Sequence, residues 1–467
     1  MKYTILIFAL ILSVSGCTSS EKTQEKPNII YILADDLGYG DLGCYGQTEI
    51  KTPSLDKMAA EGIRFTQHYA GNTVCAPSRC VLMTGLHTGH SRIRDNSALP
   101  LREEDVTVAD LLSEAGYKTG IIGKWGLGEI NTSGFPIEQG FDFFYGYLSQ
   151  LRAHNYYPDY LWRNTEQETL NNKVVYVEEG KLKGKGSAAV EQNEYSHDLF
   201  TKEALKFVDE SSDAPFFLYL AYTIPHANNE YWLVEEHGME VPDYGQYADK
   251  DWPDAQKGLA AMISRMDRDI GTLLERLKEL GIDKKTLIIF SSDNGPHQEG
   301  GNDPKFFNSS GGLRGHKRDL YEGGIREPMI AYWPETIKPG RTSDHISAFW
   351  DFLPTACDVA GIEAPENIDG ISFLPELLGM EQAEHEAMYW EFKSQGGKQA
   401  VRKGKWKLVK LDVLDPDKTR VELYDLENDR AEENDVSDSY PDVLAEMKKL
   451  LETERVESEY FQLYDIK

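Results

Sequence analysis

The sequence lacks an excess of basic residues. Its 467 residues include 78 Asp and Glu against 49 Lys and Arg, which gives a formal net charge of −29. Proteins that coat DNA or RNA neutralise many phosphates with Lys and Arg, so this balance argues against a nucleic-acid partner. The same balance predicts weak attraction for any polyanion, unless basic residues gather locally in the folded chain.

Cysteine is also scarce. The five cysteines are Cys17, Cys44, Cys75, Cys80 and Cys357. Their spacing matches no paired C-x-x-C zinc pattern, and they are too scattered for a dense disulfide framework. With 40 Gly and 20 Pro the chain is close to average composition, which excludes collagen-like and low-complexity classes. Aromatic residues make up 11%, a level that favours a globular chain with a large core.

Long apolar runs are rare, and the one that stands out is at the N-terminus. Ile5 to Leu12 follows Met1-Lys2 and is too short to span a bilayer, but it fits the apolar region of a secretory signal. Val14 to Cys17 resembles a bacterial lipobox, with an ordinary signal peptide as the alternative. We therefore predict a signal peptide at 1–16 and a tether at 17–26. The protein would be an exported bacterial lipoprotein of the periplasm or of the outer membrane and cell surface, with membrane contact only through lipid on Cys17.

Short apolar runs alternate with amphipathic stretches along residues 27–380. Runs that are apolar on both faces predict buried strands at 28–33, 118–122, 215–221 and 286–290. Apolar residues spaced by three or four predict helices at 105–115, 196–208 and 259–277. This alternation predicts an α/β fold, with a large, mostly parallel sheet sandwiched by helices.

The pattern changes after about residue 380. Short strands are expected at 388–392, 399–402, 406–411 and 421–424, followed by a helix at 441–456. We therefore predict a catalytic domain at 27–380 and a smaller α+β subdomain at 381–467, with antiparallel strands and a terminal helix. Residues 161–195 are polar and weakly patterned, which indicates a surface insertion.

Acidic residues follow two of the expected strands. Asp35-Asp36 comes after the first strand, and Asp293-Asn294 comes after the strand at 286–290. The carboxyl ends of parallel strands are where ligands collect in such folds. A lone Asp-Asp pair is more often a turn or a helix cap. Three carboxylates and an amide together suit a hard cation such as Ca²⁺ or Mg²⁺.

Cys75-Ala76-Pro77-Ser78-Arg79 is the most informative segment. Pro77 suits the first position of a short helix that ends at Thr84, before Gly85. Cys75 would then lie at a helix N-terminus, where free N–H groups favour an anion. Arg79 lies about one turn further and its guanidinium would fork onto a tetrahedral oxyanion. The pattern fits a reactive thiol in an anion cradle, with a buried structural cysteine as the alternative.

C-A-P-S-R resembles the C-x-P-S-R signature of type I sulfatases, which belong to the alkaline phosphatase superfamily. Further motifs follow in the order of that family: P-N-I-I-Y-I-L-A-D-D at 27–36, G-K-W at 123–125, I-P-H at 224–226, S-D-N-G at 292–295 and L-R-G-H-K-R-D-L-Y-E-G-G-I-R-E-P at 313–328. The resemblance, which extends to bacterial polysaccharide sulfatases, implies an alkaline phosphatase-like fold and hydrolysis of sulfate esters.

The resemblance also implies roles for individual residues. In that family the cysteine at the position of Cys75 is oxidised to Cα-formylglycine, which requires a maturation enzyme as a partner. The implied ligands of Ca²⁺, or less expectedly Mg²⁺, are Asp35, Asp36, Cys75, Asp293 and Asn294. The implied catalytic set is Cys75, Arg79, Lys124, His226 and Lys317. In this mechanism the hydrated aldehyde attacks sulfur, and His226 or Lys317 protonates the departing oxygen.

One position departs from the family pattern. Sulfatases commonly show G-K-W-H, with the histidine helping to collapse the sulfated intermediate, whereas this chain has Gly126. We expect either another base, for which His87, His90 and His297 are candidates, or elimination that relies on metal and water.

Substrate signals are weaker than catalytic ones. The residues expected to contact a substrate are His87, Arg94, His154, His297, His316 and Arg318. By analogy with the bacterial branch, the substrate would be a sulfated carbohydrate, galactose-type sugars included. Two alternatives stay open: a phosphodiester or phosphonate hydrolase of the same superfamily, and a non-catalytic, glycan-binding surface lipoprotein.

Overall fold

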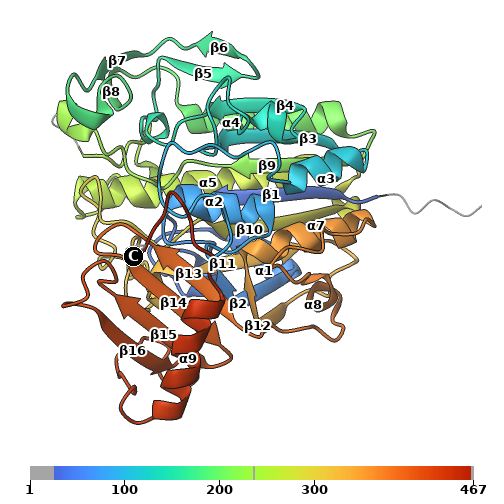
Figure 1. The fold of residues 1–467 in the computed structure, drawn as a ribbon. Coiled ribbons are helices and arrows are strands. Elements are labelled where there is room, and N and C mark those ends of the chain that lie inside the picture. The colour runs from blue at the N-terminus through green and yellow to red at the C-terminus, as the bar shows by residue number, and fades with distance from the viewer. Residues whose placement is uncertain (1–25, 235–236, 464–467) are drawn as a thin grey trace, which may run out of the picture.

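Five parallel strands form the centre of the large sheet in the computed structural model, which describes residues 26–234 and 237–463 (Figure 1). In spatial order they are β10 (Thr286–Ser292), β1 (Asn28–Ala34), β9 (Phe216–Ala221), β3 (Lys118–Lys124) and β4 (Phe143–Tyr147). All residues of β1, β9 and β10 are buried. Their runs are therefore apolar on both faces, because helices cover both sides of the sheet.

Antiparallel strands extend the sheet on both edges. Beyond β10 lie β11 (Arg326–Tyr332), β2 (Ile63–Tyr69) and β12 (Arg341–Ala348), and beyond β4 lie β5 (Tyr160–Arg163) and β6 (Glu166–Thr169). β12 pairs with β2 in parallel, and the other added strands pair antiparallel. The ten-stranded sheet is mixed but mostly parallel, which confirms the expected α/β fold class.

Alternate residues of the strands feed two cores, one on each face. Ile29, Tyr31 and Leu33 pack with α2 (Cys75–Thr84), α3 (Val108–Glu114) and α7 (Phe352–Ala360). Ile30 and Ile32 point to the opposite face, because side chains alternate along a strand. There they pack with α1 (Pro53–Glu61), α4 (Ser196–Ser211) and α5 (Asp254–Glu279).

The C-terminal region forms its own antiparallel sheet. Its order is β13 (Met388–Phe392), β14 (Lys398–Lys403), β15 (Trp406–Leu411) and β16 (Arg420–Asp425), with α9 (Pro441–Thr453) against β14 and β15. Along the chain, the short helix α6 (Glu322–Ile325) lies between β10 and β11, and α8 (Leu374–Leu378) lies between the large sheet and the C-terminal sheet. This confirms the expected small C-terminal subdomain of the fold.

Three details differ from the sequence expectations. α2 begins at Cys75, so Pro77 is its third residue and not its first. α3 begins at Val108, because Thr107 and Asp110 form a capping box there. Residues 161–195 contain β5, β6 and a hairpin of β7 (Lys173–Tyr176) and β8 (Ser187–Glu191), whose mostly half-buried or exposed residues leave a weak pattern.

The predicted signal peptide and most of the tether, with Cys17, lie outside the described residues, so export stays a prediction from the sequence. Within the described residues, none of the helices has the length and apolar character needed to cross a membrane.

A buried ion network joins the two sheets. Lys407 on β15 has its Nζ 2.8 Å from Glu322 Oε1 and 3.0 Å from Glu432 Oε1, and all three side chains are 0% exposed. Glu322, at the start of α6, also accepts from the hydroxyl of Tyr69 on β2 at 2.7 Å. Removing one partner of such a pair leaves an uncompensated buried charge, which is costly.

Lys407→Met is therefore expected to lower the free energy of unfolding by about 3–5 kcal/mol. Chemical denaturation followed by intrinsic fluorescence measures this. The control is Lys403→Met on β14, which removes a lysine that is 47% exposed and pairs with Glu446. It should cost less than about 1 kcal/mol. Equal losses in the two variants would contradict the role of the buried network.

Candidate active site

The acidic residues after β1 and β10 meet at one edge of the sheet. The two strands are parallel neighbours with Ala34 opposite Ser292, so the residues that follow each strand lie side by side. The backbone N–H of Asp36 donates to Asp293 Oδ1 at 3.1 Å, and the amide of Asn294 donates to Asp36 Oδ1 at 2.7 Å. Asp35 and these three residues are at most 1% exposed. The structure therefore brings together the residues that follow the two expected strands.

Cys75 opens α2 beside this acidic cluster. Its Sγ lies 3.2 Å from Asp35 Oδ1 and 4.0 Å from Asp36 Oδ1, and every residue of α2 is buried. Burial, and then the negative charges of Asp293 and Asp35, raise the pKa of this thiol well above its ordinary value. The unmodified side chain is therefore a protonated thiol and a poor nucleophile.

Basic side chains from three segments pair with the acids. Arg79 donates from Nε and Nη2 to Asp293 Oδ2 at 3.0 and 2.8 Å, and its Nη1 donates to the carbonyl of Lys124 at 2.7 Å. Lys124 at the end of β3 places Nζ 2.6 Å from Asp35 Oδ2. Burial raises the pKa of Asp35, but the permanent cations beside it, Lys124 first and then Arg79, outweigh burial and hold it below its ordinary value. The guanidinium fork that we expected on an oxyanion is thus engaged with Asp293.

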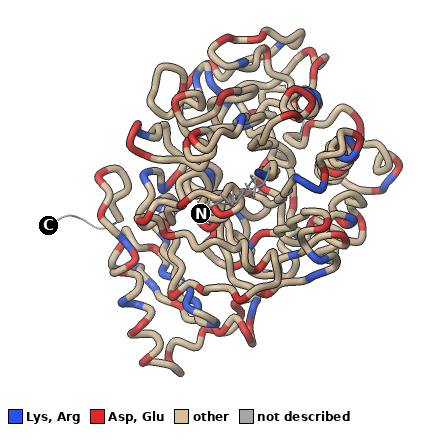
Figure 2. Tube along the Cα trace, turned by 90° about the vertical axis from the view of Figure 1, so that its right-hand side faces the viewer, with Lys and Arg blue, Asp and Glu red and all other residues tan. Residues whose placement is uncertain are grey.

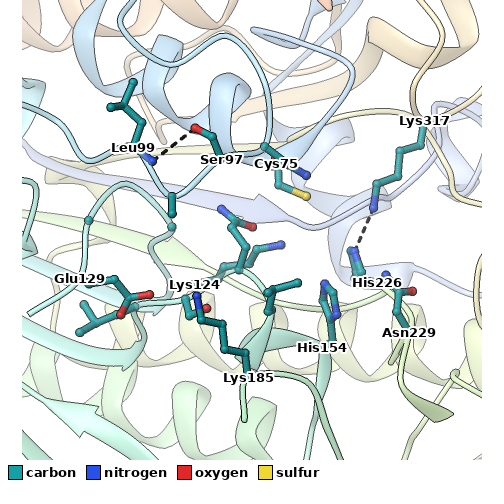
Figure 3. Close-up of a pocket in the computed structure, with 18 of the residues that line it drawn as sticks. Cys75, Ser97, Leu99, Lys124, Glu129, His154, Lys185, His226, Asn229 and Lys317 are labelled. Carbon is teal, nitrogen blue, oxygen red and sulfur yellow. Dashed lines mark hydrogen bonds between the residues drawn. The ribbon is translucent and has the colours of Figure 1, made fainter. Parts of the chain in front are cut away.

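Lys317 and His226 form a hydrogen-bonded pair at the same edge (Figure 3). Lys317 Nζ lies 2.7 Å from Asp36 Oδ2 and 2.9 Å from His226 Nε2. His226 Nδ1 lies 2.6 Å from the carbonyl oxygen of Ala227, which only accepts, so Nδ1 carries the proton and Nε2 accepts from Lys317. Burial, and then the charge of Lys317, lower the pKa of His226 to about 3. The pair is a charged lysine beside a neutral imidazole.

A cavity of about 380 Å³ opens onto these groups. Figure 3 shows Cys75, Lys124, His154, His226 and Lys317 around it. His154 stacks on His226 with ring centroids 4.9 Å apart, and its Nδ1 lies 3.0 Å from Glu230 Oε2. A buried anion cradle that combines carboxylates, cations and a helix N-terminus can bind and polarise a tetrahedral anionic ester.

Comparisons with known proteins agree with this geometry. The family model Sulfatase matches residues 27–362, and the model "N-sulphoglucosamine sulphohydrolase, C-terminal" matches residues 315–457. The chain belongs to the sulfatase family. It is therefore a sulfuric ester hydrolase of the alkaline phosphatase superfamily.

Individual relatives span most of the chain. The N-acetylgalactosamine-6-sulfatase of Canis lupus familiaris is 32% identical over 82% of this chain and 71% of its own length. The N-acetylgalactosamine-6-O-sulfatase of Bacteroides thetaiotaomicron is 30% identical over 95% of this chain and 97% of its own. The structure of Ps i-CgsB in complex with k-i-k-neocarrahexaose superimposes with a TM-score of 0.76, at 29% identity over 92% of both chains.

The structure divides the sulfatase's expected substrate-contacting residues into two groups. His154 and Arg318 lie on the cavity wall. The others are absent from that wall among the described residues, because their polar atoms contact other protein groups. His87 and the alternative base His90 face Asp369, and Arg94 pairs with Glu391. His297 Nε2 faces the carbonyl of Pro225 and its Nδ1 accepts from the N–H of Glu299, while His316 Nδ1 faces the carbonyl of Lys317. None of the three histidines proposed as the replacement base therefore lines the cavity.

The acidic cluster of the sulfatase fits a hard divalent cation. Asn294 Oδ1 is buried and has no hydrogen-bond partner among the described residues. One ligand atom from each of Asp35, Asp36, Cys75 and His226 lies within 4.8 Å of the others. With Asp293 the donor set is dominated by carboxylate and amide oxygens, which Ca²⁺ and Mg²⁺ prefer.

Several polar residues at or near the cavity were not selected from the sequence, among them Glu299, Gln150 and Asn229. Glu299 accepts from Lys317 at 3.3 Å and pairs with Arg318. Gln150 and Asn229 line the cavity with uncharged amides. Gln150 follows β4 at the carboxyl edge of the sheet, where the strand-end rule would have selected it, but β4 was not among the strands expected from the sequence. No motif marked Asn229 or Glu299, which reach the site through long loops.

The neutral state of His226 has a spectroscopic consequence. Because the pKa is lowered to about 3, the ring gains a proton only as pH falls towards that value. ¹⁵N NMR of labelled protein should show a neutral imidazole with the proton on Nδ1, unchanged between about pH 5 and 8. His226→Gln assigns the signals. A ring that titrates within that interval would contradict the geometry.

Proposed function

We propose that this sulfatase hydrolyses sulfate esters of a carbohydrate, with a formylglycine made from Cys75 as the nucleophilic residue. The observation that carries the proposal is the position of Cys75. It opens a buried helix within C-A-P-S-R, lies 3.2 Å from Asp35, and lines the cavity that Lys124 and Lys317 share. A protonated cysteine there has no evident use, whereas an aldehyde that hydrates supplies the hydroxyl nucleophile. A maturation enzyme that oxidises the cysteine is the implied partner.

A sulfated carbohydrate is the substrate class that the relatives support. Two of them are sulfatases of N-acetylgalactosamine, and Ps i-CgsB was crystallised with a neocarrahexaose. The cavity of this chain has room for about one sugar ring. Leucines and polar side chains both line it, as suits a ring with apolar C–H faces and polar edges. Galactose-type sugars are the first to test.

We propose Ca²⁺ as the metal, held by Asp35, Asp36, Asp293, Asn294 and the modified Cys75. Ca²⁺ accepts six to eight oxygen ligands in flexible geometry, whereas Mg²⁺ usually keeps several waters. The wholly buried oxygen set therefore favours Ca²⁺. When bound, the cation supplies a Lewis acid that lowers the pKa of a ligated hydroxyl and offsets negative charge.

Each basic residue of the site has its own role in the proposed reaction. Lys124 and Lys317 direct ammonium groups to the cavity, where they offset charge on the non-bridging sulfate oxygens. Arg79 holds Asp293 and the Lys124 carbonyl and so fixes both relative to α2. Lys317 carries the proton that the departing sugar oxygen needs, because neutral His226 offers only an acceptor at Nε2. His226 orients that ammonium group through the 2.9 Å contact.

Cys75→Ala tests the nucleophile. We expect kcat/KM for sulfate esters to fall by at least about 10³-fold, since the residue that attacks sulfur is lost. The matched control is Cys80→Ala, which removes a second buried cysteine from the same helix and should leave kcat/KM within a few fold. Mass spectrometry of the peptide that contains residue 75 should show an aldehyde in place of the thiol. Unchanged turnover in Cys75→Ala would sink the proposal.

Calcium should raise the thermal unfolding midpoint of the chelator-treated protein. Ca²⁺ at a hundred times its Kd contributes about 2.7 kcal/mol to a folded state that alone binds it. Asn294→Ala should reduce this shift strongly. The control Asn28→Ala removes a buried amide at the opposite end of β1 and should keep the full calcium shift, even if its baseline midpoint falls. A shift that Mg²⁺ reproduces and Asn294→Ala leaves intact would refute the assignment.

A further inference from the structure

The amide of Gln150 is an unexplained polar group of the cavity. Gln150 follows β4 and lies on the cavity wall with Cys75, Lys124 and His226. Its Nε2 and Oε1 are both buried, and neither has a hydrogen-bond partner among the described residues. Leaving a buried polar group unpaired costs about 1–3 kcal/mol. A ligand that fills the cavity and pairs with both atoms removes that cost.

Gln150 also occupies the space that a side chain at position 126 would need. The N–H of Gly126 donates to the carbonyl of Leu148 at 3.0 Å, so the segments after β3 and β4 run side by side. A Cβ on Gly126 would lie 1.7 Å from Gln150 Nε2 and 2.6 Å from its Cδ. Gly126 has a φ of +81°, which disfavours larger residues as well. The histidine common at this position in sulfatases is thus replaced in space by the amide of Gln150.

The chemistry around Gln150 indicates what it pairs with. Sulfate oxygens only accept hydrogen bonds, and Lys124, Lys317 and Arg318 already supply donors on this wall. An amide offers both a donor and an acceptor, which matches a hydroxyl group. Asn229, next to His226 in Figure 3, also has a buried Oδ1 without a partner among the described residues, so a second acceptor faces the same cavity.

We propose that Gln150 determines specificity by hydrogen bonding to a sugar hydroxyl beside the sulfate ester. This inference rests on the proposed carbohydrate sulfatase function and adds a requirement: the substrate carries a free hydroxyl at that position. An amide does not take up a proton at neutral pH, so Gln150 replaces the bulk of the histidine and not its base chemistry. A site built to bond a hydroxyl discriminates strongly against an analogue without it, because its own polar groups stay unpaired.

The test uses the full-length, matured protein and matched sugars. A panel of singly sulfated galactose and N-acetylgalactosamine identifies the best substrate, and analogues of that sugar each lack one hydroxyl. For wild type we expect kcat/KM to fall about 10–100-fold when one particular hydroxyl is removed. Gln150→Met keeps the volume beside Gly126 but has no amide. This variant should cleave the parent sugar and the analogue that lacks that hydroxyl with the same kcat/KM, so that the preference disappears.

Control variants separate recognition from packing. Gln167→Ala removes an exposed glutamine on β6 and should keep the wild-type preference. Gly126→Ala should push the Gln150 amide aside and abolish the preference, whereas adding Gly126→Ala to Gln150→Ala should change the preference no further. Thermal unfolding of each variant confirms that it is folded.

Two results would overturn the inference while sparing the proposed function. In one, Gln150→Met keeps the full preference for the hydroxyl. In the other, it loses the same factor on the parent sugar and on every deoxy analogue, which would mark a packing role. Absence of turnover of any sulfate ester by matured wild-type protein would instead overturn both proposals.

Discussion

The cost of burying three carboxylates together governs the geometry of the site. Asp35, Asp36 and Asp293 are at most 1% exposed and lie side by side at the ends of β1 and β10. Buried charges of one sign are tolerated only when cations and hydrogen bonds offset them. The chain supplies these from α2, from the end of β3 and from the segment before α6. Arg79, which ties α2 to Asp293, thereby also fixes Cys75 one helical turn away. The acids thus position the residue proposed as the nucleophile.

This local balance reconciles an acidic chain with an anionic substrate. The net charge of −29 is spread over the whole molecule, and Figure 2 shows basic and acidic residues interspersed along the chain. At physiological salt, exposed charges are screened beyond about 8 Å, whereas groups inside a cavity act at close range. Lys124 and Lys317 line the cavity and therefore act on a bound anion within that range. Whole-chain charge therefore informs solubility and encounter rate, and the cavity decides which anion binds.

The parts of the fold and site that the sequence predicted depend on local patterns. Apolar runs located β1, β9 and β10 within one or two residues, and the strand-end rule brought Asp35 and Asp293 together. The direction in which individual side chains point was harder to predict. His297 lies four residues after Asp293 along the chain, yet both of its ring nitrogens contact protein atoms away from the cavity wall. Arg94 is held by Glu391 of the C-terminal sheet, a contact between residues 297 positions apart that no motif encodes.

The cost of leaving a buried charge unpaired also separates the charged residues of the site from the neutral residues that we propose for specificity. Each charged residue of the acidic cluster contacts another buried charge, so replacing one leaves a partner uncompensated and disturbs several groups at once. Gln150 and Asn229 are neutral and have amide atoms outside any protein hydrogen bond among the described residues, so changing them disturbs few protein contacts. At Gly126 there is no side chain, and Gln150 from the segment after β4 occupies the space where a side chain at position 126 would lie. A cavity built this way can change the sugar that it accepts while the charged machinery beneath it stays fixed.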